Sequence, residues 1–216
     1  MTEVDFVDIH THSAHAGITS IVSWDLGSEQ PLPQATYVSA GIHPWSTETL
    51  NTYRAIQLLE NLPINAIGEI GLDFSKPIDK ARQREVLQAQ LEVASKRRLP
   101  VILHCVKAYN EALRILSQYQ LAAVIFHGYI GSSEQTATII KHGYYISAGE
   151  RSLESPKTIE SLRAAPLGRI FAETDTANTP IESIYGMIAD IKGLDINTLK
   201  RLIYNNFKTV FGCTTI

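Results

Sequence analysis

Two histidines separated by one threonine, His10 and His12, end a short apolar stretch near the start of the sequence. Residues two apart along a β-strand point to the same face, so the two imidazoles would converge. Neutral imidazole is a common metal ligand, and a pair at this spacing is suited to chelating an ion. Taken alone, the pair is also compatible with a turn that carries two partly exposed histidines.

Charged or imidazole side chains end other apolar runs of the sequence. They are Glu69, His104 and His127, with Asp175 a few residues beyond its run. Such a group at the end of a buried strand costs free energy unless it is paired, hydrogen-bonded or metal-bound. In α/β barrels, active sites lie at the carboxyl ends of the strands. The combined pattern predicts one metal centre, made of His10, His12, Glu69, His104, His127 and Asp175.

Two further polar residues belong to the same strand ends. His43, in the motif Gly41-Ile42-His43-Pro44, follows an apolar run. We expect it to be a neighbour of the metal ligands that orients one of them or contacts the substrate. Asp8 would share the face of His10, either as a hydrogen-bond acceptor for a ligand histidine or as a buried structural carboxylate. The sequence leaves these two roles of Asp8 equally open.

Three other residues are weaker candidates for metal binding. Glu173 competes with Asp175 as a ligand, because alternation turns both to the same side if the strand continues. His15 and His142 do not end a predicted strand, and we interpret both as structural. His142 precedes Gly143 at an expected helix end, where an imidazolium suits the helix dipole.

Eight apolar runs rich in β-branched residues predict strands, at residues 6–9, 19–23, 37–40, 66–68, 101–103, 123–126, 144–146 and 170–172. Amphipathic stretches predict helices within residues 47–61, 107–119, 132–142, 157–165, 181–192 and 197–211. The clearest helix follows Asp79 as N-cap, buries Val86, Leu87, Leu91 and Ala94, and stops before Pro100. Short strands alternating with helices predict a single-domain (β/α)₈ TIM-type barrel over residues 1–216. An open doubly wound sheet is the rival.

The first two connections are short. A crossover that includes a helix needs at least ~10–12 residues. Only residues 10–18 separate the first two predicted strands, and residues 24–36 before the third include Pro31 and Pro33. We therefore expect the first crossover helix to be missing and the second to be shortened.

The composition is that of an ordinary globular protein. The 216 residues are 44% hydrophobic and 19% charged, with a net charge of −3, so no strong field attracts polyanions. A nucleic-acid substrate would need a local basic strip or metal ions. Cys105 and Cys213 cannot form a disulfide framework. Without a signal-like amino terminus or ~18 consecutive apolar residues, we expect a cytoplasmic protein with no membrane contact and no obligate protein partner.

Six motifs in order resemble the TatD family of metal-dependent deoxyribonucleases. They are Asp8-Ile-His10-Thr-His12, Gly41-Ile-His43-Pro44, Ile67-Gly-Glu69-Ile-Gly-Leu-Asp73, Leu103-His104-Cys105, Phe126-His127-Gly128-Tyr129 and Glu173-Thr-Asp175. The resemblance implies a (β/α)₈ fold and two divalent ions on the six ligands named above, with Glu69 bridging both. It also implies Asp175 as the ligand in place of Glu173, and single-stranded DNA as the expected substrate.

The residues around the expected ligands depart from the family pattern. Family members usually carry an arginine where this sequence has Val106, followed by Lys107, and a Phe-Ser-Gly where it has Tyr129-Ile130-Gly131. Lys107 and Tyr129 are candidates to contact phosphate or base, or else a solvated lysine and a packed tyrosine. Trp45 could stack a base or cap the barrel.

The expected chemistry is hydrolysis of a phosphodiester by a water that two metal ions activate, with Asp175 as the general base. Mixed imidazole and carboxylate ligands suit zinc, manganese or iron, and magnesium more weakly. One alternative is a hydrolase of an amide, lactone or phosphomonoester on the same metal shell. The other is a non-catalytic metal-binding module.

Overall fold

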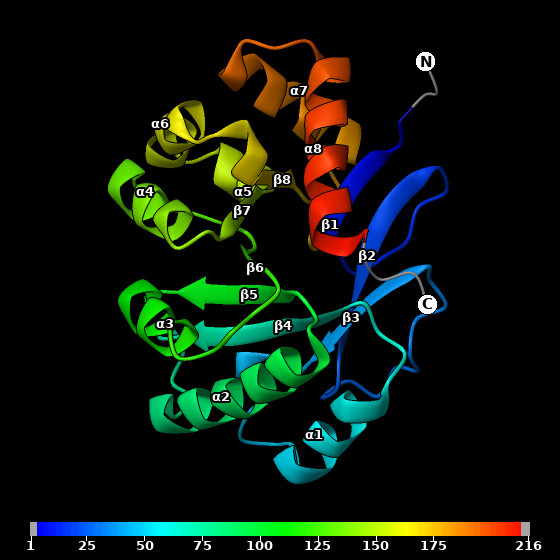
Figure 1. Cartoon of the computed structure of the whole chain (residues 1–216), viewed down its shortest axis with the longest axis vertical. Helices are drawn as coiled ribbons and strands as arrows, with labels where there is room; N and C mark the ends of the chain where they lie inside the picture. Colours follow the sequence, from blue (N-terminus) through cyan, green and yellow to red (C-terminus); the bar gives the residue numbers. More distant parts are fainter. Residues whose placement is uncertain (1–3, 213–216) are drawn as a thin grey trace. The chain divides into compact units, whose positions relative to one another are not determined.

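The computed structural model describes residues 4–212, and along them strands and helices alternate (Figure 1). These residues form two compact units, one from Val22–Ile125 and the other from residues 1–21 and 126–216 as far as they are described. Cys213 lies outside the described residues. None of the helices within residues 4–212 combines the length and the apolar character needed to cross a membrane.

The unit of residues 22–125 is built on three parallel neighbours, β3 (Tyr37–Gly41), β4 (Ala66–Asp73) and β5 (Val101–Val106). Ser39 lies opposite Ala66, and Gly71 lies opposite His104. All eight residues of β4 are buried, as expected of a strand covered on both faces. β2 (Ile18–Asp25) enters this unit from the other one, and the strand contains the boundary between them.

The helices of this unit are α1 (Thr52–Asn61), α2 (Lys80–Arg97), α3 (Tyr109–Leu116) and the 3₁₀ helix η1 (Pro44–Ser46). In α2 the carboxylate of Asp79 accepts hydrogen bonds from the N–H groups of Ala81 and Arg82. The expected apolar stripe of α2 is buried, and Arg98 ends the helix in a left-handed conformation. The prediction for this helix is confirmed.

The second unit holds β1 (Phe6–Thr11), β7 (Tyr145–Ala148) and β8 (Ile170–Ala172), and β6 (Val124–Phe126) enters it across the other boundary. β7 and β8 are paired in parallel, and a parallel bridge joins Thr11 to Asp175. Its helices are α4 (Ser133–Lys141), α5 (Glu150–Leu153), α6 (Pro156–Ala164), η2 (Leu167–Arg169), α7 (Ile181–Lys192) and α8 (Ile196–Phe211). The buried Tyr185 of α7 bonds the backbone of Val7 through its hydroxyl.

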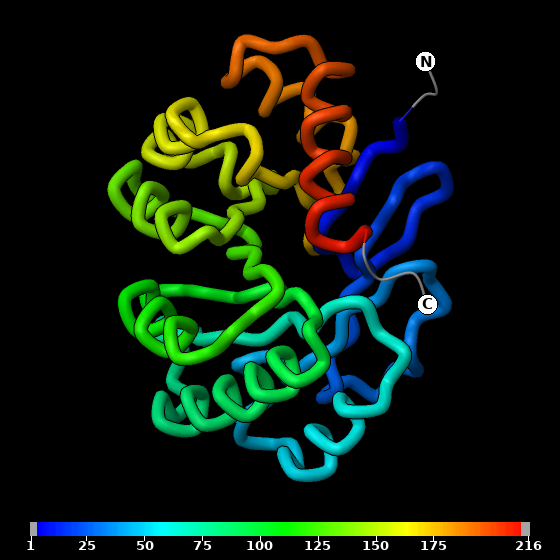
Figure 2. The backbone as a smooth tube through the Cα atoms, viewed as in Figure 1, coloured from blue at the N-terminus to red at the C-terminus, as the bar shows by residue number. Residues whose placement is uncertain are grey.

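All eight predicted strands are present, and they neighbour one another in chain order, β1 to β8. This order is that of a TIM-type α/β barrel and excludes the reversed strand order of a doubly wound sheet. The first crossover helix is absent, as expected (Figure 2). The prediction of a shortened second helix is wrong, because residues 26–36 contain only turns, bends and irregular chain. Pro31 and Pro33 remove two backbone donors in this short connection and so disfavour a helix.

Candidate metal centre

Three of the predicted ligands lie together at the end of β1 and just beyond β8. Nε2 of His10 is 3.6 Å, and Nε2 of His12 is 3.4 Å, from Oδ1 of Asp175. One ligand atom from each of the three residues lies within 4.8 Å of the others. His10 is fully buried, whereas the side chains of His12 and Asp175 are partly exposed. We call these three residues the Asp175 cluster.

Asp175 is oriented by a bend of the backbone. Its φ is 51°, in the left-handed region, and its N–H donates to the carbonyl of His10 at 2.9 Å. Burial acts to raise the pKa of the Asp175 carboxyl, but hydrogen bonds from His10 and His12 hold this pKa below its ordinary value. The carboxylate is therefore kept charged beside the two imidazoles.

Asp8 holds the residue before Asp175. Its carboxylate accepts hydrogen bonds from the N–H of Thr174 at 3.0 Å and from the Thr174 hydroxyl at 2.6 Å. Burial raises the pKa of Asp8 to about 6, although the bonds from Thr174 act to lower it. Of the two roles that the sequence left open, these contacts fit the buried structural carboxylate.

His127 and Glu173 lie next to this cluster. The rings of His10 and His127 are 4.3 Å apart between centroids, and Nδ1 of His127 is 3.4 Å from Oε1 of Glu173. Glu173 also accepts hydrogen bonds from the N–H of Gly128 at 2.6 Å and from the hydroxyl of Ser147. Because the strand ends at Ala172, Glu173 and Asp175 contact different partners. Continued alternation would have turned them to one side.

A second group of ligand atoms lies in the unit of residues 22–125. Oε1 of Glu69 is 3.1 Å from Nε2 of His43 and 2.6 Å from Nδ1 of His104. Ligand atoms of these three residues also lie within 4.8 Å of one another. We call them the Glu69 cluster. His43 was predicted as a neighbour of the ligands, and its atoms are placed here as closely as those of the predicted ligands.

The backbone of β4 approaches that of β5 at His104. Gly71 has a φ of 152°, and a Cβ added to it would lie 1.9 Å from the carbonyl oxygen of His104. Glycine is the residue that tolerates both this φ and this contact. On the other side of the His104 ring, Nε2 is 3.5 Å from Oδ2 of Asp73. Asp73 thus joins the site, although the sequence offered no signal for its role beyond its place in a motif.

Asp73 also links the Glu69 cluster to an exposed aromatic ring. The indole N–H of Trp45 donates to Oδ2 of Asp73 at 2.8 Å, and Nζ of Lys76 lies 4.6 Å from the centre of the Trp45 ring. Burial acts to raise the pKa of Asp73, but bonds from Ser75 and Trp45 lower it overall. The bond to Asp73 holds the Trp45 side chain in place, and this side chain remains 51% exposed.

Two predicted substrate contacts have different surroundings. Lys107 is exposed, with a φ of 53°. Tyr129 is 1% exposed, its hydroxyl donates to the carbonyl of Ser132, and it accepts from Thr136. The burial of Tyr129 fits a packed tyrosine better than a substrate contact.

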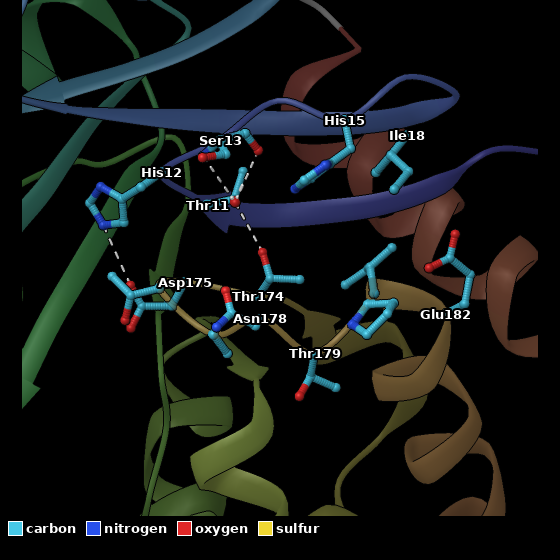
Figure 3. Close-up of a pocket in the computed structure, with 14 residues that line it drawn as sticks. Thr11, His12, Ser13, His15, Ile18, Thr174, Asp175, Asn178, Thr179 and Glu182 are labelled. Atoms are coloured by element: carbon cyan, nitrogen blue, oxygen red, sulfur yellow. Dashed lines mark hydrogen bonds and ion pairs between the residues drawn. The ribbon is translucent and has the colours of Figure 1, made fainter.

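The two remaining histidines differ from each other. His142 caps α4, with Nδ1 2.8 Å from the carbonyl of Thr138, so its predicted structural role is confirmed. His15 is exposed and lines a cavity of about 570 Å³ that also borders His12 and Asp175 (Figure 3). Its distance in sequence from any strand end concealed this position, because the turn after β1 brings it back toward the site.

The donor sets of both clusters fit divalent ions. Each offers two imidazoles and one carboxylate, a combination that suits zinc, manganese or iron. Three protein ligands with further positions open are typical of catalytic sites, whereas structural zinc sites are closed by four.

Comparison with known proteins agrees with this chemistry. The family model described as TatD related DNase matches residues 23–212. The chain is 28% identical to the "3'-5' ssDNA/RNA exonuclease TatD" of Pantoea ananatis, over 81% of this chain and 77% of that protein. It is 27% identical to YjjV of Escherichia coli K12, an "uncharacterized metal-dependent hydrolase", over 83% of this chain and 78% of the relative.

Solved structures show the same fold. The crystal structure of YjjV from Escherichia coli K12 matches with a TM-score of 0.82 and 22% identity, over 96% of this chain and 98% of that one. A TatD family hydrolase from Entamoeba histolytica matches with a TM-score of 0.77 and 17% identity, over 98% and 99% of the two chains. Fold and site together define a TIM-type α/β barrel with histidines and acids at its strand ends. The chain belongs to the TatD-related DNase family of metal-dependent hydrolases.

Proposed function

We propose that this protein is a two-metal phosphodiesterase that cleaves single-stranded nucleic acid, with DNA as the expected substrate. The observation that carries the proposal is the presence of two donor sets with no residue in common, the Asp175 cluster and the Glu69 cluster. A purely structural ion would need a single site closed by four ligands, whereas each of these sets offers three. The nuclease names of the relatives support the choice of a phosphodiester substrate.

We assign His10, His12 and Asp175 to one ion. Glu69 and His104 are assigned to the other ion, and His127 is a further ligand of this two-metal site. A bridging role of Glu69 is implied by the family resemblance. His43 contacts Glu69 and either orients that carboxylate or donates to the substrate. The short contacts within each cluster support these assignments.

Bound divalent ions supply Lewis-acid polarisation of the phosphoryl group and a lowered pKa of the attacking water. We assign to Asp175 the role of taking the proton of that water, and the partial exposure of its carboxylate at the edge of the cavity supports this assignment. His10 and His12 hold Oδ1 of this carboxylate. The other carboxylate oxygen, Oδ2, is the atom that we expect to receive the proton.

We propose manganese or zinc as the ions with the highest affinity, since imidazole-rich sites bind them more tightly than magnesium. We expect magnesium to support turnover where it is abundant. Elemental analysis of the purified protein, combined with titration by each metal, would count the ions, and we expect two per chain.

The test is hydrolysis of single-stranded oligonucleotides with Mg²⁺, Mn²⁺ or Zn²⁺ added, beside a panel of an amide, a lactone and a phosphomonoester. We expect cleavage of the oligonucleotide, loss of it with a chelator, and a fall of at least ~100-fold in kcat for Asp175→Asn. Circular dichroism of the variant should match the wild type. Cleavage of only a panel compound would replace the phosphodiesterase assignment, and full activity of Asp175→Asn would remove the general-base role.

A further inference from the structure

The cavity of about 570 Å³ extends well beyond the metal ligands that border it. Small-molecule sites commonly measure ~300–1,000 Å³, so the space can hold a group as large as a nucleoside. Its walls come from the end of β1, the turn that follows and the first residue of β2, and from residues 174–182, which lead into the start of α7. Both segments belong to the same compact unit.

The cavity has a metal end and an acidic end. Figure 3 shows His12 and Asp175 at one side and Glu182 at the opposite side, with His15 and Asn178 between them. Glu182 is the second residue of α7 and is exposed. A carboxylate in the first turn neutralises the partial positive charge at the start of the helix, so this helix start does not attract a phosphate.

The described residues that line the cavity include no Lys or Arg to receive a phosphate. The hydroxyl of Thr179 donates to Glu150, the first residue of α5, so a second carboxylate lies behind the same wall. A phosphate next to Glu182 would therefore lie close to two carboxylates, and like charges placed together are strongly unfavourable.

Neutral polar groups and a few apolar ones make up the rest of the lining. Ser13, Thr176 and Asn178 offer hydroxyl and amide groups that both donate and accept hydrogen bonds. Ile18 and Ile181 supply apolar surface. Sugar hydroxyls and base edges are the parts of a nucleic acid that match such a lining.

We infer that this cavity receives the terminal nucleoside of the strand, and that Glu182 rejects a strand whose end carries a phosphate. The inference rests on the proposed function, because it places the scissile phosphate at the Asp175 cluster. A strand that continued through the cavity would bring its next phosphate to Glu182. An end with a free hydroxyl brings no charge there.

A binding experiment tests this without relying on turnover. Isotope-labelled protein with saturating Mg²⁺ is titrated with thymidine, its 3'-monophosphate, its 5'-monophosphate and its 3',5'-bisphosphate, and amide signals are followed by NMR. We expect thymidine and one of the monophosphates to shift signals of residues 176–182. The bisphosphate should bind at least ~10-fold more weakly than that monophosphate, because one of its phosphates must face Glu182.

Variants assign this discrimination to one side chain. Glu182→Gln should reduce the ratio between monophosphate and bisphosphate to about threefold or less, and Glu182→Lys should invert it. Glu160→Gln is the matched control, since Glu160 is an exposed glutamate of α6 that does not line the cavity. It should keep the wild-type ratio.

The outcomes separate the two proposals. Absence of shifts in residues 176–182, equal affinity for monophosphate and bisphosphate, or an unchanged ratio in Glu182→Gln would overturn the cavity assignment even if the protein cleaves DNA. Nucleoside binding with the expected ratios, in a protein that hydrolyses no phosphodiester, would support the cavity assignment and remove the proposed function.

Discussion

His104 and His127 each lie close to a buried carboxylate that we do not assign to a metal ion. Asp73 is 3.5 Å from His104, and Glu173 is 3.4 Å from His127. A carboxylate beside an imidazole fixes the orientation of the ring and raises its basicity toward a metal. At the scale of single residues, these two carboxylates are therefore the groups most worth changing without touching a ligand.

Glu173→Gln should weaken metal binding. The substitution keeps a hydrogen-bond acceptor for the N–H of Gly128 but removes the charge beside His127. Loss of such a partner typically costs ~10–100-fold in metal affinity or activity. Calorimetric titration with Mn²⁺ measures this loss of metal affinity. Ser147→Ala is the control, because it removes one hydrogen bond to Glu173 and leaves the charge; equal losses in the two variants would contradict the electrostatic role.

Trp45→Ala should weaken substrate binding. Its accessible ring is fixed by the bond to Asp73, and stacking on an aromatic ring contributes ~1–3 kcal/mol per base, or about 5–150-fold in KM. Trp45→Phe keeps a ring and should retain most of the affinity. Tyr53→Ala, which removes a 73% exposed aromatic side chain of α1, should leave KM unchanged. An unchanged KM in Trp45→Ala would show that the ring only covers Asp73.

At the scale of elements, helix α2 positions two strand ends through buried glutamines. Oε1 of Gln90 accepts from the N–H of Ile42 at 2.6 Å, and its Nε2 donates to the carbonyl of Ile42 at 3.2 Å. Gln83 makes the same pair of bonds to the backbone of Asp73, at 2.7 and 3.1 Å. These bonds replace strand pairing where β3 and β4 end, next to His43 and Asp73.

Gln90→Leu should destabilise the fold and disturb the site. It leaves the N–H and carbonyl of Ile42 buried without their partner, at a cost of ~1–3 kcal/mol for each such group. The free energy of unfolding in urea should therefore fall by about 2 kcal/mol or more, and activity should fall because His43 follows directly. Gln118→Leu changes an exposed glutamine of the same unit and is the control. A loss below about 0.5 kcal/mol, the usual range for surface changes, would contradict the argument.

At the scale of the whole molecule, the prediction of a single domain means that the two compact units should unfold together. The boundaries between them fall at Ile21/Val22 and at Ile125/Phe126, inside β2 and β6. Domain boundaries normally fall in exposed linkers where few contacts cross. Boundaries within strands therefore argue that the two units fold together.

The two tryptophans offer a direct measurement of this coupling. Trp24 and Trp45 both lie in the unit of residues 22–125, so their fluorescence reports on that unit, whereas far-ultraviolet circular dichroism reports on both. We expect the two signals to give coincident urea transitions, the mark of a two-state domain. Separate midpoints would mean that the units unfold independently and would contradict the single-domain prediction.

The sequence by itself determined the order of the elements. Apolar runs marked all eight strands, because strands buried on both faces contain few polar residues. It also marked the chemistry, since histidines and acids at strand ends are costly unless they have a partner. The N-cap Asp79 and the apolar stripe of α2 could be predicted because helix caps and helical periodicity are local signals in the sequence.

The tertiary structure decided the rest. The backbone turn at Asp175 separated it from Glu173, and no local pattern encodes a left-handed residue that is not glycine. The burial of Tyr129 favours a packing role for this residue, and the turn after β1 places His15 in the wall of the cavity that His12 and Asp175 also line. The roles of Asp73, Gln83 and Gln90 depend on partners far along the chain or on backbone groups that sequence does not show. The sequence gives the types of residue, but which of their atoms come into contact depends on how distant segments of the chain pack together.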